Sequence, residues 1–276
     1  MGPVTPALLD DLVRAAASEV LAARGLDPAA LPADAGIGRP REPAQGEYAT
    51  TIALRTAGLP PRELADRLTE RSEVADAAVA GPGFVNLRLT AQGRAAVVAE
   101  ALRDDVDGAR MAAAAGGTAV PDDLVAAVGK DTARFAVLRG TTPDVALLAR
   151  HVPENPAFRV RYAHARLVAL ARNAADLGVA VGPDPGVLTD RCEIELVRCL
   201  AEFPAVVRSG VPHRLARHLE ALADAVLDVN DSCAVLPRGD EDVTDRHRAR
   251  LAMIVAARRV LAHGLGLLGV TAPERI

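Results

Sequence analysis

The segment from Asn155 to Arg172, NPAFRVRYAHARLVALAR, holds the side chains best suited to binding chemistry. At 100° per helical residue, Arg159, Tyr162 and Arg166 fall within about 60° of one another on one helix face. A ring between two guanidinium groups can stack on an unpaired nucleotide base while the guanidiniums contact phosphate. A solvated helix face rich in arginine would show the same pattern, so the spacing alone leaves both interpretations open.

Six histidines are candidates for acid–base or metal chemistry, but none lies in a recognisable motif. His213 and His218 lie at positions i and i+5, which does not place two ligands on one helix face. The chain contains no HExxH, GxSxG or GxxxxGK[ST] motif. We therefore expect no catalytic residues, no metal site and no cofactor.

The three cysteines, Cys192, Cys199 and Cys233, include no CxxC pair. Their odd number, and first residues (MGPVTPALLDD) without the features of a signal peptide, favour buried, reduced thiols in a cytoplasmic protein. No apolar run approaches the roughly 20 residues needed to cross a bilayer, so we expect no membrane partner.

The chain lacks the surplus of basic residues that is usual in dedicated nucleic-acid-binding proteins. The net charge is −4, with 36 acidic residues against 32 lysines and arginines. A protein of this charge has no general attraction to phosphate, so we expect no DNA partner and require any nucleic-acid site to be a local arrangement.

Two domains are expected in 276 residues, and the pattern changes between them. Residues 1–103 predict an α+β domain, with Thr5 as the first helix cap and a Gly-Pro-Gly turn between two strands. Its expected helices span 5–24, 50–57, 61–71 and 90–102, and its expected strands span 74–80 and 84–89.

Residues 104–121, which include the tract MAAAAGGTAVP, show no sustained period and predict a linker. Residues 122–276 show helical patterns only, with Pro143, Pro156 and Pro212 at first-turn positions, and predict an all-α helical bundle. The expected helices of this second domain span 122–138, 144–150, 156–177, 189–208, 212–231 and 243–268.

Four stretches, taken in chain order, resemble arginyl-tRNA synthetase. They are GEYATTIAL from Gly46, GPGFVNLRL from Gly81, NPAFRVRYAHAR from Asn155 and LLGVTAPERI ending at Ile276. The similarity implies the N-terminal domain of that family, followed by its helical anticodon-binding domain, which is called DALR.

The resemblance also implies that catalysis is lost, because the linker over 104–121 stands where the family inserts its ATP-binding catalytic domain. The family's HxGH sequence is absent, and a KMSKS loop is impossible in a chain whose single lysine is Lys130. Aminoacyl-adenylate chemistry depends on such positive groups near the phosphates.

Phe84 and Asn86 match family residues that contact an unpaired base at the outer corner of tRNA, and Tyr162 and Arg166 match residues that touch the anticodon loop. Placement of Phe84 in the core, with Asn86 satisfying the turn, remains the alternative. Arg159 stands where the family has an aromatic residue, and we include it among the expected tRNA contacts.

Other departures weaken the expectation that an arginine anticodon is read specifically. The family's aromatic-rich FYExC reads VNDSC at 229–233, and the final residue, often Met, is Ile276. Each lost aromatic removes a stacking contact of roughly 1–3 kcal/mol per base.

The sequence therefore supports a non-catalytic tRNA-binding protein that contacts the outer corner and the anticodon region of tRNA. The alternative is a protein-interaction module that has lost tRNA binding. Its partner would be a synthetase or an enzyme that uses aminoacyl-tRNA.

Overall fold

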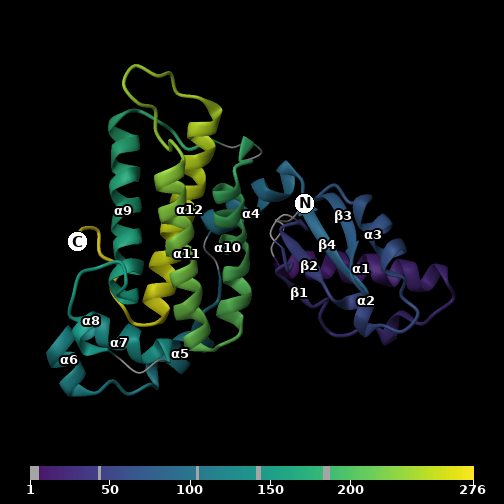
Figure 1. Ribbon diagram of the computed structural model, residues 1–276, viewed down its shortest axis with the longest axis horizontal. Helices are drawn as coiled ribbons and strands as arrows, with labels where there is room; N and C mark the ends of the chain where they lie inside the picture. Colours follow the sequence, from purple (N-terminus) through teal and green to yellow (C-terminus); the bar gives the residue numbers. More distant parts are fainter. Residues whose placement is uncertain (1–5, 43–44, 104–105, 141–143, 183–186) are drawn as a thin grey trace. The chain divides into compact units, whose positions relative to one another are not determined.

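The structure is a computed structural model that describes residues 6–42, 45–103, 106–140, 144–182 and 187–276. The chain divides into two compact units, Met1–Val97 and Val98–Ile276. Figure 1 shows a mixed first unit and a helical second unit. Each unit buries its own apolar core.

A four-stranded antiparallel sheet with strand order β1-β2-β4-β3 forms the centre of the first unit. The strands are β1 (Ile37–Gly38), β2 (Tyr48–Thr50), β3 (Val74–Ala80) and β4 (Phe84–Leu89). Along β4, Val85, Leu87 and Leu89 are almost fully buried, whereas Arg88 is exposed. Since side chains alternate along a strand, one face of β4 lies on the core, and Phe84, Asn86 and Arg88 share the other face.

Helices cover the core face of this sheet. The first unit contains α1 (Pro6–Ala23), α2 (Ile52–Arg55), α3 (Pro61–Thr69) and a short 3-10 turn at Pro28–Ala30. The helix α4 (Ala91–Arg103) begins in the first unit and continues into the second from Val98. α3 packs on β3 and β4, and α1 packs on α3. Leu64 and Leu68, one turn apart on α3, are fully buried, which follows from their helical spacing.

The expected helix over 50–57 is shorter in the structure, because Thr50 belongs to β2 and α2 covers only Ile52–Arg55. Pairing with β4 determines this strand, which is too short to show a period of its own. Gly46, just before β2, has a φ of +146°. A Cβ at this position would lie 2.7 Å from the Leu87 carbonyl oxygen, so the close approach of the two strands requires glycine.

Glu47 and Arg94 form a buried ion pair that joins the start of α4 to the sheet. Their side chains are 7% and 11% exposed, and Glu47 Oε1 lies 2.9 Å from Arg94 Nη1. Glu47 Oε2 also accepts a hydrogen bond from the backbone N–H of Leu89 at 2.5 Å. The motif that begins at Gly46 therefore has a structural role in this fold.

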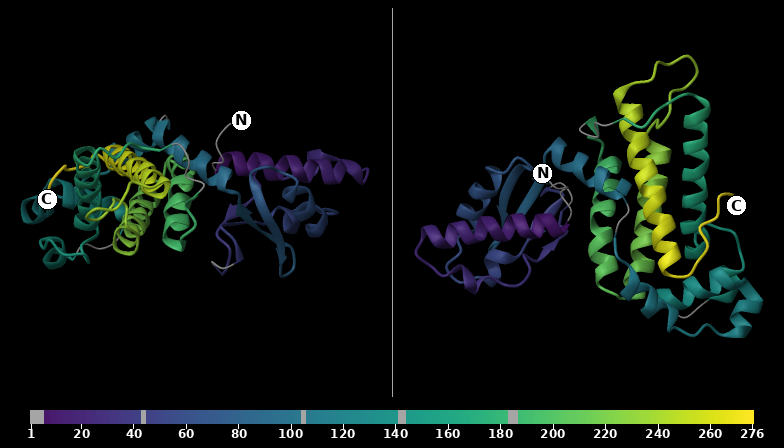
Figure 2. Two further views of the ribbon diagram at one scale, coloured as in Figure 1. Left: turned by 90° about the horizontal axis from the view of Figure 1, so that it is seen from above. Right: turned by 180° about the vertical axis from the view of Figure 1, so that it is seen from behind.

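The second unit is helical throughout the part of the chain that the structure describes. It contains α5 (Ala109–Gly116), α6 (Asp122–Val128), α7 (Lys130–Arg139), α8 (Val145–Leu148), α9 (Pro156–Asp176), α10 (Arg191–Arg208), α11 (Pro212–Ser232) and α12 (Asp245–Leu267). The four longest helices, α9 to α12, pack side by side (Figure 2). This arrangement confirms the predicted fold class, an α+β domain followed by an all-α bundle.

Two segments of the second unit differ in detail from the sequence-based expectation. Residues 104–121, expected to be a linker, contain α5, whose Met111 and Ala115 are fully buried because α5 packs on α10, α11 and α12. The expected helix 122–138 is divided at Gly129, which has a φ of +82°. Thr5, Pro143 and the first two residues of the expected linker, 104 and 105, lie outside the described residues. Among those described, no helix is long and apolar enough to cross a bilayer.

The residues after α12 return along α9. Arg161 Nε donates to the Thr271 carbonyl oxygen at 3.3 Å, and His164 Nδ1 lies 2.9 Å from the Pro273 carbonyl oxygen. Since a carbonyl only accepts, Nδ1 of His164 carries the proton. Burial lowers the pKa of His164 below its usual value, although the hydrogen bond to Pro273 acts in the opposite direction.

This lowered pKa predicts that acid destabilises the second unit. The folded state favours neutral His164, so its contribution to the free energy of unfolding is complete above the unfolded pKa of about 6.5 and declines as the pH falls below it. Denaturant unfolding at pH 7.5 and pH 5 should therefore give a lower free energy of unfolding at pH 5. His164→Gln, which keeps a donor near Pro273, should show a smaller decrease. An equal decrease in the two proteins would contradict this role for His164.

Candidate nucleic-acid interface

Asn155 starts α9 and fixes the direction of the helix. Its Oδ1 accepts from the backbone N–H groups of Ala157 and Phe158 at 3.1 and 3.2 Å, and its Nδ2 donates to the carbonyls of Leu148 and Arg150, both at 2.9 Å. Asn155 is 1% exposed, and every polar atom of its amide has a partner. This residue therefore positions the side chains that follow it.

Three rings lie in series at the start of α9, and we call His151, Phe158 and Tyr162 the aromatic ladder. The centroids of His151 and Phe158 are 5.4 Å apart with 10° between the ring planes, and those of Phe158 and Tyr162 are 5.7 Å apart with 20°. Tyr162 is 38% exposed, which leaves part of its ring available to a ligand. Such a surface can stack an unpaired base, because every base has a π face.

Of the three rings, only Tyr162 was predicted as a site residue from the sequence. Phe158 precedes Tyr162 by four residues, and this spacing places two side chains in contact on a helix, so the signal was present. His151 lies before the helix, and its position depends on the turn that leads to Asn155. No spacing rule predicts it.

Acidic side chains neutralise the positive charge of Arg159. Its Nη2 lies 3.4 Å from Glu220 Oε2, and its Nε lies 3.2 Å from Asp224 Oδ1, both on α11. Arg139 also contacts Glu220, at 2.5 Å. Two acidic side chains thus balance the two guanidiniums, so Arg159 is less suited to hold phosphate than its position on α9 suggested.

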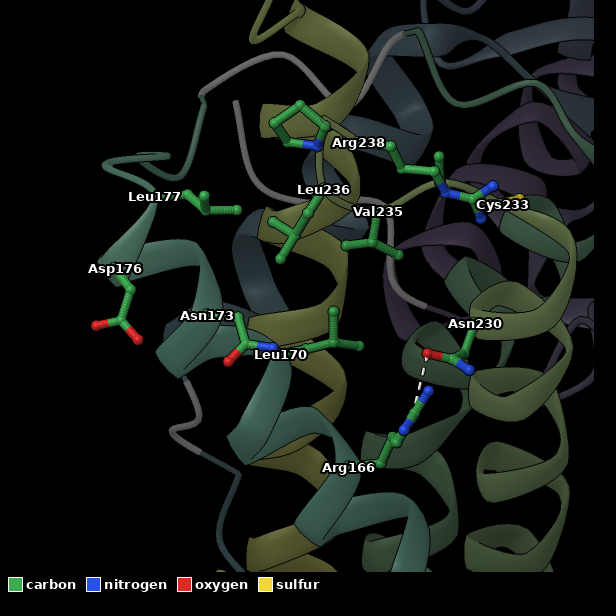
Figure 3. Close-up of a pocket in the computed structure, with 12 residues that line it drawn as sticks. Arg166, Leu170, Asn173, Asp176, Leu177, Asn230, Cys233, Val235, Leu236 and Arg238 are labelled. Carbon is green, nitrogen blue, oxygen red and sulfur yellow. Dashed lines mark hydrogen bonds between the residues drawn. The ribbon is translucent and has the colours of Figure 1, made fainter. Parts of the chain in front are cut away.

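Arg166 continues the line of the aromatic ladder by one more turn and borders a cavity of about 540 Å³. Its Nε lies 3.4 Å from Asn230 Oδ1 on α11 (Figure 3). The cavity is lined by Arg166, Leu170, Asn173, Asp176, Leu177, Asn230 and residues 233–238. Its size is within the usual range for ligand pockets, and its lining contains both charged and amide side chains.

In the first unit, Phe84 and Asn86 lie on the face of β4 opposite the core, in agreement with their spacing. Phe84 is half-buried, and Asn86 is 5% exposed because the exposed side chain of Gln45 covers it. Asn86 Nδ2 donates to Gln45 Oε1 at 3.0 Å. A base could reach the Asn86 amide only by displacing Gln45, whereas Arg88, two residues further on the same face, is already exposed.

The structure thus brings the expected residues together in two separate groups. Tyr162 and Arg166 lie on one line along α9, with Arg159 beside them in an ion-pair cluster. Phe84 and Asn86 belong to the first unit. Arg88 is an addition to this second group, and its place two residues after Asn86 on a strand is the sequence signal that indicates a shared face.

Comparisons with known proteins match the two units separately. The arginyl tRNA synthetase N terminal domain matches residues 7–89, and the DALR anticodon binding domain matches residues 160–276. An arginyl-tRNA synthetase from Thermus thermophilus is 23% identical over 65% of this chain and 32% of its own, with a TM-score of 0.43. A Campylobacter jejuni protein described as an arginyl-tRNA synthetase is 17% identical over 56% of this chain and 35% of its own, with a TM-score of 0.45. In these alignments the chain spans about a third of the length of each.

Proposed function

We propose that this chain, which joins an arginyl-tRNA synthetase N-terminal domain to a DALR anticodon-binding domain, is a non-catalytic tRNA-binding protein. The observation that carries the proposal is the aromatic ladder on α9, which leads to Arg166 and the cavity beside Asn230. Stacking surfaces next to a guanidinium and amide groups are what unpaired nucleotides need. The anticodon region of tRNA supplies such nucleotides.

The face of β4 that carries Phe84, Asn86 and Arg88 supports a second contact, with the outer corner of tRNA. A half-buried ring can stack a base, and an amide can read a base edge once Gln45 moves aside. Exposed Arg88 can contact phosphate. In the proposal this face adds affinity to the contact made by the second unit.

The proposal assigns no aminoacylation activity to the chain. The HxGH and KMSKS sequences are absent. Residues 104–121, where the synthetase family inserts its catalytic domain, are a short segment rich in Ala and Gly. Because Glu220 and Asp224 already pair with Arg159, we expect Arg166 to make the main phosphate contact of this surface.

A titration of the purified protein with total tRNA and with individual tRNAs, at several salt concentrations, tests the proposal. We expect binding that weakens with salt, and Arg166→Ala should reduce the slope of log K against log salt by about one unit. Arg172→Ala is the matched control, since Arg172 is exposed on a different face of α9 and should leave the slope unchanged.

The alternative function, a module that binds another protein, predicts a different result. The net charge of −4 and the neutralised Arg159 favour this alternative. If no tRNA binds at low salt, or if Arg166→Ala and Arg172→Ala behave alike, the tRNA proposal is wrong. A search for a partner synthetase or an enzyme that uses aminoacyl-tRNA would then be the next step.

A further inference from the structure

Two thiols lie against each other at one end of the helical bundle. Cys192 Sγ and Cys233 Sγ are 3.1 Å apart, although the residues are 41 positions apart in the chain. Cys192 is the second residue of α10, and Cys233 follows the last residue of α11. A disulfide bond is about 2.05 Å long, so the sulfurs need to approach by only about 1 Å to form one.

Charged groups hold both helix ends in place around these thiols. Arg250, on α12, donates to Glu193 Oε1 at 2.6 Å, to Asp190 Oδ2 at 2.8 Å and to the Ala234 carbonyl at 2.8 Å. Glu193 is fully buried and accepts from the backbone N–H groups of Thr189 and Asp190. These contacts fix the residues on either side of Cys192 and Cys233, so the short distance between the sulfurs is a property of the packed bundle.

A metal ion is the other ligand that this cluster suggests. Side-chain atoms of Asp190, Glu193 and Cys233 all lie within 4.8 Å of one another. The Arg250 guanidinium already contacts both carboxylates and supplies the positive charge that a metal would bring. A cation would have to displace it, and the cluster is therefore better suited to thiol chemistry.

We propose that Cys192 and Cys233 form an oxidisable thiol pair that a small-molecule disulfide, of the glutathione type, converts to an intramolecular disulfide. Cys192 is the more exposed of the two, and Cys233 is 6% exposed, so the oxidant meets Cys192 first. This modification does not depend on whether the protein binds tRNA.

The reaction is two successive thiol–disulfide exchanges. The Cys192 thiolate attacks one sulfur of the small disulfide, whose S–S bond breaks and releases one small thiol. Cys233 Sγ then attacks Cys192 Sγ and releases the second small thiol. Two protein thiols are oxidised to one disulfide, and the small disulfide is reduced to two thiols.

The surroundings of Cys233 explain why it acts second. Burial, with a contribution from Cys192, raises the pKa of the Cys233 thiol to about 12, so this sulfur keeps its proton in the reduced protein. During the second exchange this proton passes to the departing small thiolate, which leaves as the second small thiol.

The test uses the full chain, reduced and then incubated with glutathione disulfide. Peptide mapping without reductant should identify a Cys192–Cys233 cross-link and find Cys199 outside it, still in the thiol form. Closing a loop of this length should raise the Tm of the helical unit by about 5–10 °C, and dithiothreitol should reverse the shift. Cys199→Ala is the matched control and should form the same cross-link.

Cys233→Ala should stop the reaction after its first step and retain one glutathione on Cys192, once circular dichroism has shown that the variant is folded. Three results would overturn the proposal: both thiols remain free in the wild type, glutathione stays on Cys192 of the wild type, or the cross-link forms without an increase in Tm. The last result would mean that the thiols meet only after the bundle is distorted.

Discussion

Tyr162→Ala is expected to weaken tRNA binding by about 1–3 kcal/mol, which is a loss of roughly 5- to 150-fold in affinity. The exposed ring of Tyr162 ends the aromatic ladder, and a base that stacks on it would lose that contact. Stacking involves no counterion release, so the loss should be nearly the same at low and high salt, unlike the effect of Arg166→Ala.

Tyr162→Phe is the matched control, because it keeps the ring and removes only the hydroxyl. Its affinity should stay within about threefold of the wild type, whereas Phe158→Ala should weaken binding by removing the support under Tyr162. The effects of Phe158→Ala and Tyr162→Ala should not add, since the two rings are in contact. Wild-type affinity in Tyr162→Ala, in a correctly folded protein, would rule out the ladder as the stacking surface.

Glu47→Ala is expected to destabilise the first unit by about 3–5 kcal/mol, because it leaves the buried Arg94 guanidinium without its charge partner. It also removes an acceptor from the Leu89 N–H. Since a protein with two units need not unfold in one step, hydrogen exchange of the β4 amides is the appropriate measurement, and exchange should become markedly faster.

Glu63→Ala is the control for this prediction. Glu63 pairs with Arg24 at 2.8 Å, but both side chains are about half exposed, at 49% and 46%. Exposed pairs of this kind contribute about 0–1 kcal/mol, so exchange in β4 should change little. Similar exchange rates in the Glu47→Ala and Glu63→Ala variants would show that burial does not strengthen the Glu47–Arg94 pair.

The sequence predicts most helices of the second unit because each carries its own local signals. Pro156, for example, is predicted at the first turn of a helix, and the structure confirms this position at the start of α9. The segments that the sequence does not reveal depend on distant partners. β1 and β2 are only two and three residues long, and pairing with neighbouring strands of the sheet stabilises them. α5 is stabilised by burial of Met111 in the helical bundle.

The candidate site also contains some residues with local sequence signals and others whose positions depend on distant partners. Tyr162 and Arg166 follow from helical spacing and from the resemblance to the synthetase family. The ion pairs of Arg159 depend on Glu220 and Asp224, about 60 residues further along the chain, and no local pattern could place those acids opposite it. The cover that Gln45 provides over Asn86 depends in the same way on the sheet bringing the two residues together.

The contact between His164 and the Pro273 carbonyl has a consequence for the order in which the protein can fold during translation. These residues are 109 positions apart, and α12, which also packs on α9, lies between them in the chain. At about 5–20 residues per second, the ribosome needs roughly 5–20 s to add the partners of α9 after the helix itself has been made. The first unit, which ends at Val97, is synthesised before α9, whereas the part of α9 that packs on α11 and α12 stays uncovered until those helices have been added.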